Sequence, residues 1–251
     1  MRVVGVIPAR LQSSRLPRKL LLDRTGKTLI QHTWEAARQA SSLSELIVAT
    51  DSLEIADVVK RFGGRAEMTG EHPSGTDRVA DVVRRHCPRA DIIVNVQGDE
   101  PEIDPHQINL LVDTLTRSLA AEMATLSTPI RHKSERDSAS CVKVVCTSDG
   151  RALYFSRATV PFVRDGNPDE LLTKATPWQL HIGLYAYRRD FLMHLTKLPP
   201  CELEQLEKLE QLRALEYGAT IQVASVEHRA VGIDTPEDYA RFVERQRSRA
   251  A

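Results

Sequence analysis

The first hundred residues alternate between short apolar runs and amphipathic segments, and this alternation restricts the possible folds more than any other feature. Runs at 3–7, 46–49 and 91–96 are rich in valine and isoleucine. The segments that follow them repeat apolar residues every three or four positions, as helices packed on one face do. Apolar strands separated by helices predict a mostly parallel sheet that is covered on both faces.

Local signals place further elements in the same region. A first helix is predicted after Gly26, where the three- and four-residue spacing of apolar side chains begins. Ser52 is suited to cap a second helix, and Gly63 is suited to end it. A short strand is predicted at 65–68 and a third helix at 76–86.

From about residue 120 the pattern changes to short strands with few helices between them. Strands are predicted at 123–129, 142–147, 152–155, 181–187 and 220–225. The polar segment 161–178 is rich in turn residues and is predicted as an ordered loop. Helices are predicted at 203–217 and 235–247.

No internal repeat, low-complexity tract or linker-like stretch interrupts the chain. The most economical interpretation is therefore a single α/β domain covering 1–251. Its core is expected at about 1–120 and 220–251, and a mixed α/β insertion is expected at about 121–219.

Charge is balanced, because 34 lysines and arginines face 34 aspartates and glutamates. Such a balance argues against a partner that is bound by bulk charge, such as duplex DNA or an anionic bilayer. The apolar opening is short and ends near Arg10, unlike a signal peptide. No apolar run approaches the ~20 residues of a membrane helix. We expect a cytoplasmic protein with no nucleic-acid or membrane partner.

Cysteine usage gives no sign of a disulfide framework or a zinc site. The four cysteines form no C-x-x-C pair; they are Cys87, Cys141, Cys146 and Cys201. In a chain of this length, reduced and buried thiols are the expected state.

Four cations follow the first apolar run within ten residues: Arg10, Arg15, Arg18 and Lys19. In an open α/β sheet, ligands bind beyond the carboxyl ends of the strands. Backbone amides and cationic side chains at such a place suit a nucleoside triphosphate. The alternative is a solvated loop whose cations pair with surface acids. A phosphate loop of the G-x-x-x-x-G-K-[ST] type is not present.

Two acidic segments are candidates for a metal site. Gly98-Asp99-Glu100 follows the strongest predicted strand, and its carboxylates suit Mg²⁺, although a plain turn would explain them too. Asp234 precedes the helix start at Thr235-Pro236. Asp234 is either the N-cap of that helix or a second metal ligand, and the residues leave both open.

A turn of small residues precedes the third predicted helix, at Ser74-Gly75-Thr76. A helix N-terminus of this kind offers amides and hydroxyls to a polar ring or to a phosphate. Simple capping by Ser74 or Thr76 is the alternative.

Taken in order, ten segments resemble those of the 3-deoxy-manno-octulosonate cytidylyltransferases, also called CMP-Kdo synthetases. They are I-P-A-R-x-x-S-x-R-L-P-x-K (7–19), A-T-D (49–51), M-T (68–69), H-x-S-G-T-D-R (72–78), V-N-V-Q-G-D-E-P (94–101), V-K-V-V (142–145), A-L-Y-F-S-R-A (152–158), H-I-G-L-Y-A-Y (181–187), L-E-Q-L-R (209–213) and G-I-D-T-P-E-D (232–238). The related sialic acid enzymes share the opening but follow it with a glycine-rich stretch, which 11–13 lacks. Cys141 departs from the small or polar residue expected before V-K-V-V.

The resemblance implies a Rossmann-like nucleotidyltransferase fold with a mixed dimerisation insertion, and hence a homodimer. It also implies the reaction of CTP with 3-deoxy-D-manno-octulosonate (Kdo) to give CMP-Kdo and pyrophosphate. This reaction depends on Mg²⁺ and supplies an activated sugar acid for lipopolysaccharide biosynthesis.

Roles for matching positions follow from the same resemblance. The catalytic residues are Lys19, Arg10, Asp99 and Asp234, with Asp99 and Asp234 as the metal ligands. The CTP-binding residues are Ala9, Arg10, Arg15, Lys19, Ser74, Gly75, Arg78 and Gln97. The sugar-binding residues are Gln97, Arg157, His181, Tyr185 and Glu210.

Several of these roles have plainer alternatives. His181 and Tyr185 alternate on one strand face and can be packing residues. Glu210 can be a solvated acid, and Arg18 can point to solvent. Lys143 can face either the sugar carboxylate or the partner in a dimer.

Two other classes of protein stay open. One is a glycosyltransferase that uses a sugar nucleotide, although Asp99-Glu100-Pro101 lacks the second aspartate of a D-x-D motif. The other is a nucleotide-binding protein without catalytic activity.

Overall fold

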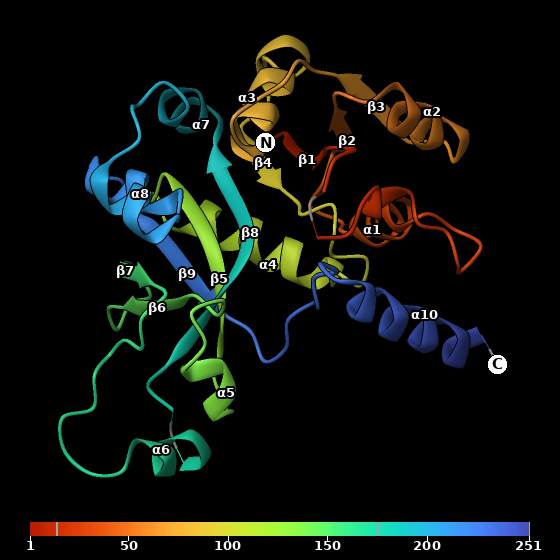
Figure 1. Cartoon of the computed structure of the whole chain (residues 1–251). Coiled ribbons are helices and arrows are strands. Elements are labelled where there is room, and N and C mark those ends of the chain that lie inside the picture. Colours follow the sequence, from red (N-terminus) through yellow and green to blue (C-terminus); the bar gives the residue numbers. More distant parts are fainter. Residues whose placement is uncertain (14, 175, 251) are drawn as a thin grey trace. The chain divides into compact units, whose positions relative to one another are not determined.

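The computed structural model describes residues 1–13, 15–174 and 176–250, and the chain divides into two units (Figure 1). The first unit comprises Met1–Asn109 and Ala230–Ala251, and the second comprises Leu110–Arg229. Helix α4 (Pro105–Arg117) begins in one unit and ends in the other, so the divisions differ from the expected positions near 120 and 220. A single domain stays a prediction.

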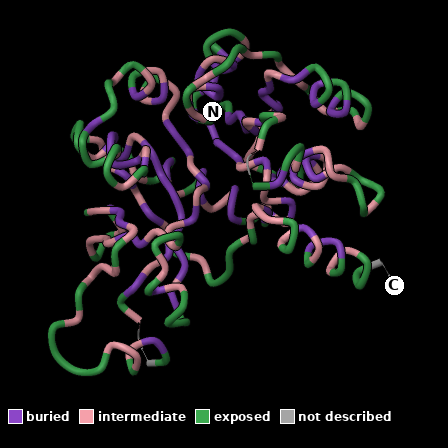
Figure 2. The backbone as a smooth tube through the Cα atoms, viewed as in Figure 1, coloured by how far each residue is buried: buried purple, intermediate pink, exposed green. Residues whose placement is uncertain are grey.

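The sheet of the first unit consists of parallel strands in the order β3-β2-β1-β4. These strands are β1 (Val3–Ala9), β2 (Glu45–Thr50), β3 (Arg65–Met68) and β4 (Ile92–Asn95). The three long apolar runs are buried along nearly their whole length, as Figure 2 shows. Burial on both faces explains why they read as continuous runs of valine and isoleucine, and it confirms the predicted parallel sheet.

Helices α1 (Leu29–Ala37), α2 (Leu53–Arg61) and α3 (Gly75–His86) belong to the same unit. Helix α2 packs on β2 and β3, and α3 packs on β1, β2 and β4. Their N-caps are Ser52 and Ser74, whose hydroxyls accept from the amides of Ile55 and Asp77. Capping by Ser74 is therefore real, and Thr76 lies inside the helix.

Two further elements complete the first unit. The 3₁₀ helix η1 (Lys19–Leu21) follows Arg18, which has a left-handed backbone at φ 56°. Helix α10 (Pro236–Ala250) packs near α1, because the rings of Phe242 and His32 lie 5.1 Å apart.

The second unit is built around strand β5 (Met123–Pro129). It pairs antiparallel with β8 (Gln179–Arg188) and parallel with β9 (Ile221–Ser225). Strand β6 (Lys143–Cys146) pairs antiparallel with β8 and with β7 (Ala152–Ser156). Mixed pairing agrees with the change of sequence pattern near residue 120.

Five helices of the described chain surround these strands. They are α5 (Lys133–Arg136), α6 (Pro168–Lys174), α7 (Arg189–Leu195), α8 (Glu202–Glu207) and α9 (Gln211–Glu216).

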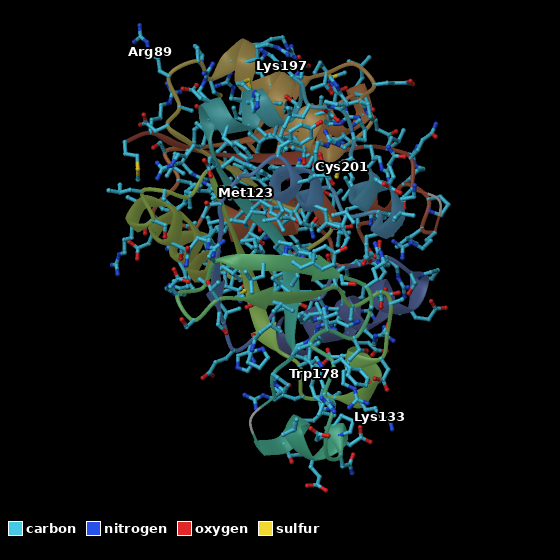
Figure 3. The ribbon with its side chains drawn as sticks, turned by 90° about the vertical axis from the view of Figure 1, so that its left-hand side faces the viewer. Arg89, Met123, Lys133, Trp178, Lys197 and Cys201 are labelled. Carbon is cyan, nitrogen blue, oxygen red and sulfur yellow. The ribbon has the colours of Figure 1, made fainter. Side chains whose placement is uncertain are left out.

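The prediction of a loop over 161–178 is wrong in part, because α6 lies within it. Trp178 is 1% exposed and packs with Leu172, Ile130 and Leu180. It lies at the same end of the second unit as Lys133 of α5 (Figure 3), and Asp169 of α6 accepts from Lys133 at 3.0 Å. Val163 and Leu171 pack against the same cluster, so a mostly polar segment can hold a helix when a few of its apolar side chains enter a core.

The predicted helix over 203–217 is wrong in part, because Lys208 adopts a left-handed backbone and divides it into α8 and α9. The helical periodicity spans this break because leucines recur every three residues at 203, 206, 209 and 212. Only Leu209 and Leu212 are buried, whereas Leu203 and Leu206 on α8 are exposed. Contacts that hold the break come from a distant strand and are described below.

The remaining expectations concern cysteines and membrane helices. Cys87 and Cys201 are buried free thiols, whereas Cys141 and Cys146 are only partly buried. In the described part of the chain, no helix combines the length and apolar character needed to cross a bilayer.

Candidate active site

A cavity of about 360 Å³ opens where strands β1 and β4 end, beside the start of helix α3. Its volume is in the range of small-ligand sites. Its lining includes Ala9, Arg10, Lys19, Ser74, Gly75, Arg78, Gln97 and Asp99. Parallel strands end at one edge of their sheet, so segments that are distant in sequence meet here.

Lys19 is the electrostatic centre of this site. Its Nζ lies 2.5 Å from Oδ2 of Asp99 and 3.0 Å from Oδ1 of Asp234. It also donates to the carbonyl of Ile233 at 3.1 Å. The side chain is only 13% exposed, so protein oxygens surround the ammonium more than water does.

Backbone packing brings both acids to Lys19. The amide of Ile233 donates to the carbonyl of Asp99 at 2.9 Å, which joins the segment before α10 to the loop after β4. At Gly98 a Cβ atom would lie 3.2 Å from the carbonyl oxygen of Pro8. The close approach of the two strand ends therefore favours glycine at this position.

The structure bears on one of the two roles left open for Asp234, that of helix N-cap. The hydroxyl of Thr235 accepts from the amide of Asp238 at 3.2 Å, so Thr235 caps helix α10. The carboxylate of Asp238 accepts in return from the amides of Asp234 and Thr235. Asp234 is not needed as the cap, and its carboxylate faces Lys19 instead.

The other three cations of the opening segment have different surroundings. Arg15 lies 3.0 Å from the same oxygen of Asp234 and is largely exposed. Arg10 is exposed and lines the cavity. Arg18 pairs with Glu54 on α2 at the surface. This agrees with the solvent-facing alternative for Arg18.

Ser74, Gly75 and Arg78, at the start of α3, line one side of the cavity. A Cβ atom at Gly75 would meet Cγ of Pro8 at 3.4 Å, so this turn lies against the end of β1. Ser74 is engaged as a helix cap. Arg78 lines the cavity, but its guanidinium is mostly buried and pairs with Asp51 at 2.6 Å.

In the second unit, three of the predicted sugar-binding residues form a cluster. The rings of His181 and Tyr185 lie 5.4 Å apart on strand β8. Burial, together with the negative charge of Glu210, raises the pKa of Tyr185. Burial also lowers the pKa of His181 to about 3, so its ring is neutral near pH 7.

The surroundings of the Thr125 hydroxyl favour one tautomer of His181. The single hydroxyl proton of Thr125 has two carbonyl acceptors, Ile182 at 3.0 Å and Leu184 at 2.9 Å. Its oxygen is therefore free to accept from Nε2–H of His181 at 3.0 Å. This contact leaves Nδ1 of the ring as an acceptor.

His181 gives the protein a predicted pH dependence. Its folded pKa is below the unfolded value of 6.5, so the unfolded chain binds the proton first as pH falls. The free energy of unfolding should therefore decrease by about 2 kcal/mol between pH 7 and pH 5 on account of this ring. Urea denaturation of wild type and His181→Gln at both pH values measures the difference.

The exposed residue His194 provides the control, and His194→Gln should keep the full pH dependence of the wild type. Equal pH dependence in wild type and His181→Gln would show that burial does not hold this ring neutral.

Two cations of the second unit, Arg157 and Lys143, donate to backbone carbonyls. Nε of Arg157 donates to the carbonyl of Glu207 at 2.6 Å, and Nη1 donates to that of Ala139 at 3.0 Å. Lys143 is completely buried, and its ammonium donates to three backbone carbonyls, those of Ser138, Cys141 and Arg157. Arg157 therefore holds the break between α8 and α9, whereas Lys143 joins backbone segments within the second unit.

Gln211, the residue after Glu210, was not among the predicted site residues. It is 5% exposed, and its Nε2 has no hydrogen-bond partner among the described residues. A buried amide without a partner is costly, and a bound polar group would relieve that cost. Gln211 follows Glu210 directly in the L-E-Q-L-R motif, so the motif itself was the signal.

Asp99 and Asp234 are suitable ligands for the metal that the resemblance implies. Mg²⁺ prefers carboxylate oxygens and keeps water and phosphate oxygens as its other ligands. In residues 1–13, 15–174 and 176–250, no group of three or more His, Cys, Asp or Glu side chains is arranged to hold a metal. Two protein carboxylates that leave room for phosphate and water fit Mg²⁺ better than a metal that needs a full protein shell.

Comparison with known proteins gives a consistent result along the chain. A family model described as cytidylyltransferase matches residues 4–221. A 3-deoxy-manno-octulosonate cytidylyltransferase of Rhodopirellula baltica is 50% identical over 248 residues, covering 98% of each chain. One of Geobacter sulfurreducens is 46% identical, covering 98% of this chain and 99% of the relative.

Solved structures agree with the sequence matches. A CMP:2-keto-3-deoxy-manno-octonic acid synthetase complexed with CTP superposes with a TM-score of 0.91 at 40% identity, covering 99% of this chain and all of the other. A 4-diphosphocytidyl-2C-methyl-D-erythritol synthase of Anaerococcus prevotii reaches a TM-score of 0.61 at 11% identity, with 98% of each chain covered. The second likeness shows a shared fold only.

Proposed function

This chain belongs to the cytidylyltransferase family, and we propose that it transfers the cytidylyl group of CTP to the anomeric hydroxyl of Kdo, releasing pyrophosphate. The observation that carries the proposal is the contact of Lys19 with both Asp99 and Asp234 beside the cavity at the strand ends. Family membership supports CTP as the nucleotide substrate. The names of the relatives support Kdo as the sugar acid.

The proposed reaction is an in-line attack of the sugar hydroxyl on the α-phosphorus of CTP. Both reactants are anions, so their repulsion must be reduced before they can meet. Arg10, Arg15 and Lys19 supply positive charge beside the cavity for the triphosphate and for the departing pyrophosphate. Charges fixed in place before the reaction stabilise the transition state at little reorganisation cost.

Asp99 and Asp234 would hold Mg²⁺, which when bound neutralises phosphate charge and makes an alcohol more acidic. Lys19 keeps the two carboxylates close together through its own contacts. With this arrangement no separate protein base is required for the attacking hydroxyl.

We propose Gln97, which lines the cavity of the first unit, as a sugar-binding residue. In the second unit we propose His181, Tyr185 and Glu210, together with Gln211, which follows Glu210 in the sequence. Neutral His181 and the Gln211 amide can hydrogen-bond to hydroxyl groups and to a carboxylate. Arg157 stays a proposed sugar-binding residue, and its Nε also donates to the carbonyl of Glu207.

We further propose that the product CMP-Kdo serves lipopolysaccharide biosynthesis, and that the protein is a cytoplasmic homodimer. These proposals come from the resemblance of the chain to its relatives.

The direct test incubates the protein with CTP, Mg²⁺ and a panel of sugar acids, and identifies the product by mass. We expect pyrophosphate release and CMP-Kdo with Kdo, and little product with sialic acid or with UTP. Transfer from CMP-sugars without pyrophosphate release would favour a glycosyltransferase. CTP binding without turnover of any sugar acid would favour a non-catalytic binding protein.

A further inference from the structure

A buried guanidinium joins three sequence motifs at one point of the first unit. Arg78 closes the H-x-S-G-T-D-R motif, and its side chain is 6% exposed. Its Nη2 lies 2.6 Å from Oδ2 of Asp51, the last residue of A-T-D. Its Nη1 donates to the hydroxyl of Thr69 in M-T and approaches the carbonyl of Gly70 at 3.4 Å. The proposed reaction gives no role to Asp51 or Thr69.

The location of these residues explains why they meet. Asp51 follows strand β2 and Thr69 follows strand β3, and the two parallel strands are neighbours (Figure 1). The amide of Thr69 donates to the carbonyl of Thr50 at 2.8 Å, so the two strand ends are already joined by their backbones. Arg78 on α3 adds a third element to this point.

The segment 70–74 runs from this point to the N-terminus of α3, and its residues His72, Pro73 and Ser74 line the cavity. A second set of contacts holds it from the helix side. Nε2 of His72 lies 3.3 Å from Oδ2 of Asp81, and Arg85 donates to the carbonyl of Met68 at 2.8 Å.

Asp81 is the centre of that second set. It accepts from Arg84 and Arg85, and these contacts hold its pKa near 2 against the raising effect of burial. The segment is therefore fixed on the strand side by Arg78 and on the helix side by Asp81.

Asp51 is the anionic partner that keeps the Arg78 guanidinium in position. A guanidinium as buried as that of Arg78 needs an anionic partner to keep its position, because loss of the partner leaves an uncompensated charge. Without that partner, Arg78 would move toward water, and it would release Thr69 and Gly70 at the start of the segment.

We propose that Asp51 is a positioning residue for the nucleotide. By pairing with Arg78 it holds segment 70–74 in the shape that receives CTP. The proposal rests on the proposed function, since it takes CTP as the ligand of the cavity. It gives the A-T-D and M-T motifs a role, which the proposed reaction does not.

The test measures the dissociation constant for CTP by calorimetry without sugar acid, and then kcat and KM by pyrophosphate release. Asp51→Asn should raise Kd and KM for CTP about tenfold, in the range of coupling energies between contacting residues. Its kcat and its KM for Kdo should stay within about threefold of wild type. Asp113→Asn, which makes the same change in an exposed Asp–Arg pair on α4, should have no effect.

A double-mutant cycle separates positioning from direct contact with the nucleotide. If Asp51 acts through Arg78, then Asp51→Asn adds little to the loss of CTP affinity already caused by Arg78→Lys. Full additivity of the two losses would overturn the proposal.

Thr69→Val is a milder variant, in case Asp51→Asn does not fold. It removes only the hydroxyl that Arg78 contacts, and it should raise Kd for CTP about threefold at unchanged kcat. Wild-type affinity for CTP in both folded variants would refute the positioning role and leave the proposed function standing. A wild-type protein that does not turn over CTP and Kdo would refute the function itself.

Discussion

Replacing Lys19 with methionine should reduce kcat by about 10²–10³-fold, the loss typical for one preorganised charge-stabilising group. Methionine has a similar length but no charge, so it cannot offset the charge of the departing pyrophosphate. The two carboxylates that now share the ammonium, Asp99 and Asp234, would also face each other without their common counter-charge. Pyrophosphate release at saturating CTP, Kdo and Mg²⁺ measures the effect.

Lys27→Met is the matched control, because Lys27 pairs with Glu35 on the surface at 2.6 Å and is not part of the cavity lining. It should keep wild-type kcat. Circular dichroism establishes that both variants are folded. A folded Lys19→Met protein with kcat within threefold of wild type would show that this ammonium is not part of the reacting site.

Asp234→Asn should reduce kcat by roughly 100-fold, equivalent to ~2.7 kcal/mol of barrier, and should weaken the response to Mg²⁺. The substitution keeps the shape of the side chain but removes one of two negative charges. Its carboxylate does not cap α10, since Thr235 does, so the helix should persist. Rates measured over a range of Mg²⁺ concentrations, with Mn²⁺ binding followed separately by electron paramagnetic resonance, test both parts.

Asp190→Asn is the control for this change, because the Asp190 side chain is 95% exposed on α7. It should leave the rate and Mn²⁺ binding unchanged. A non-catalytic binding protein predicts that Asp234→Asn alters affinity alone. If Asp234→Asn kept the wild-type rate and the wild-type Mn²⁺ affinity, Asp234 would not be a metal ligand.

The parallel sheet could be predicted because a strand that is buried on both faces is apolar at nearly every position. Strands β1, β2 and β4 are covered on both faces, and so each is a continuous apolar run. Once the order of strands and helices is known, the loops after β1 and β4 must lie at the same edge. This is why Lys19 and Asp99 could be expected to meet although 80 positions separate them.

Other features could not be predicted, because they depend on partners that no local pattern records. Arg157 and Lys143 look like cations available to a ligand, yet backbone carbonyls of the second unit engage both. The break at Lys208 is hidden for the same reason. The leucine spacing continues through the break, yet the leucines before it are exposed and those after it are buried.

By itself, the sequence of this protein determined the alternation of strands and helices, the edge of the sheet where charged loops gather, and the family that it resembles. Only the tertiary structure decided that Thr235 caps α10, that backbone carbonyls engage Lys143, and that Asp51 pairs with Arg78. Local patterns follow from burial along one segment, whereas the partner of a charged side chain is set by whichever distant segment packs against it.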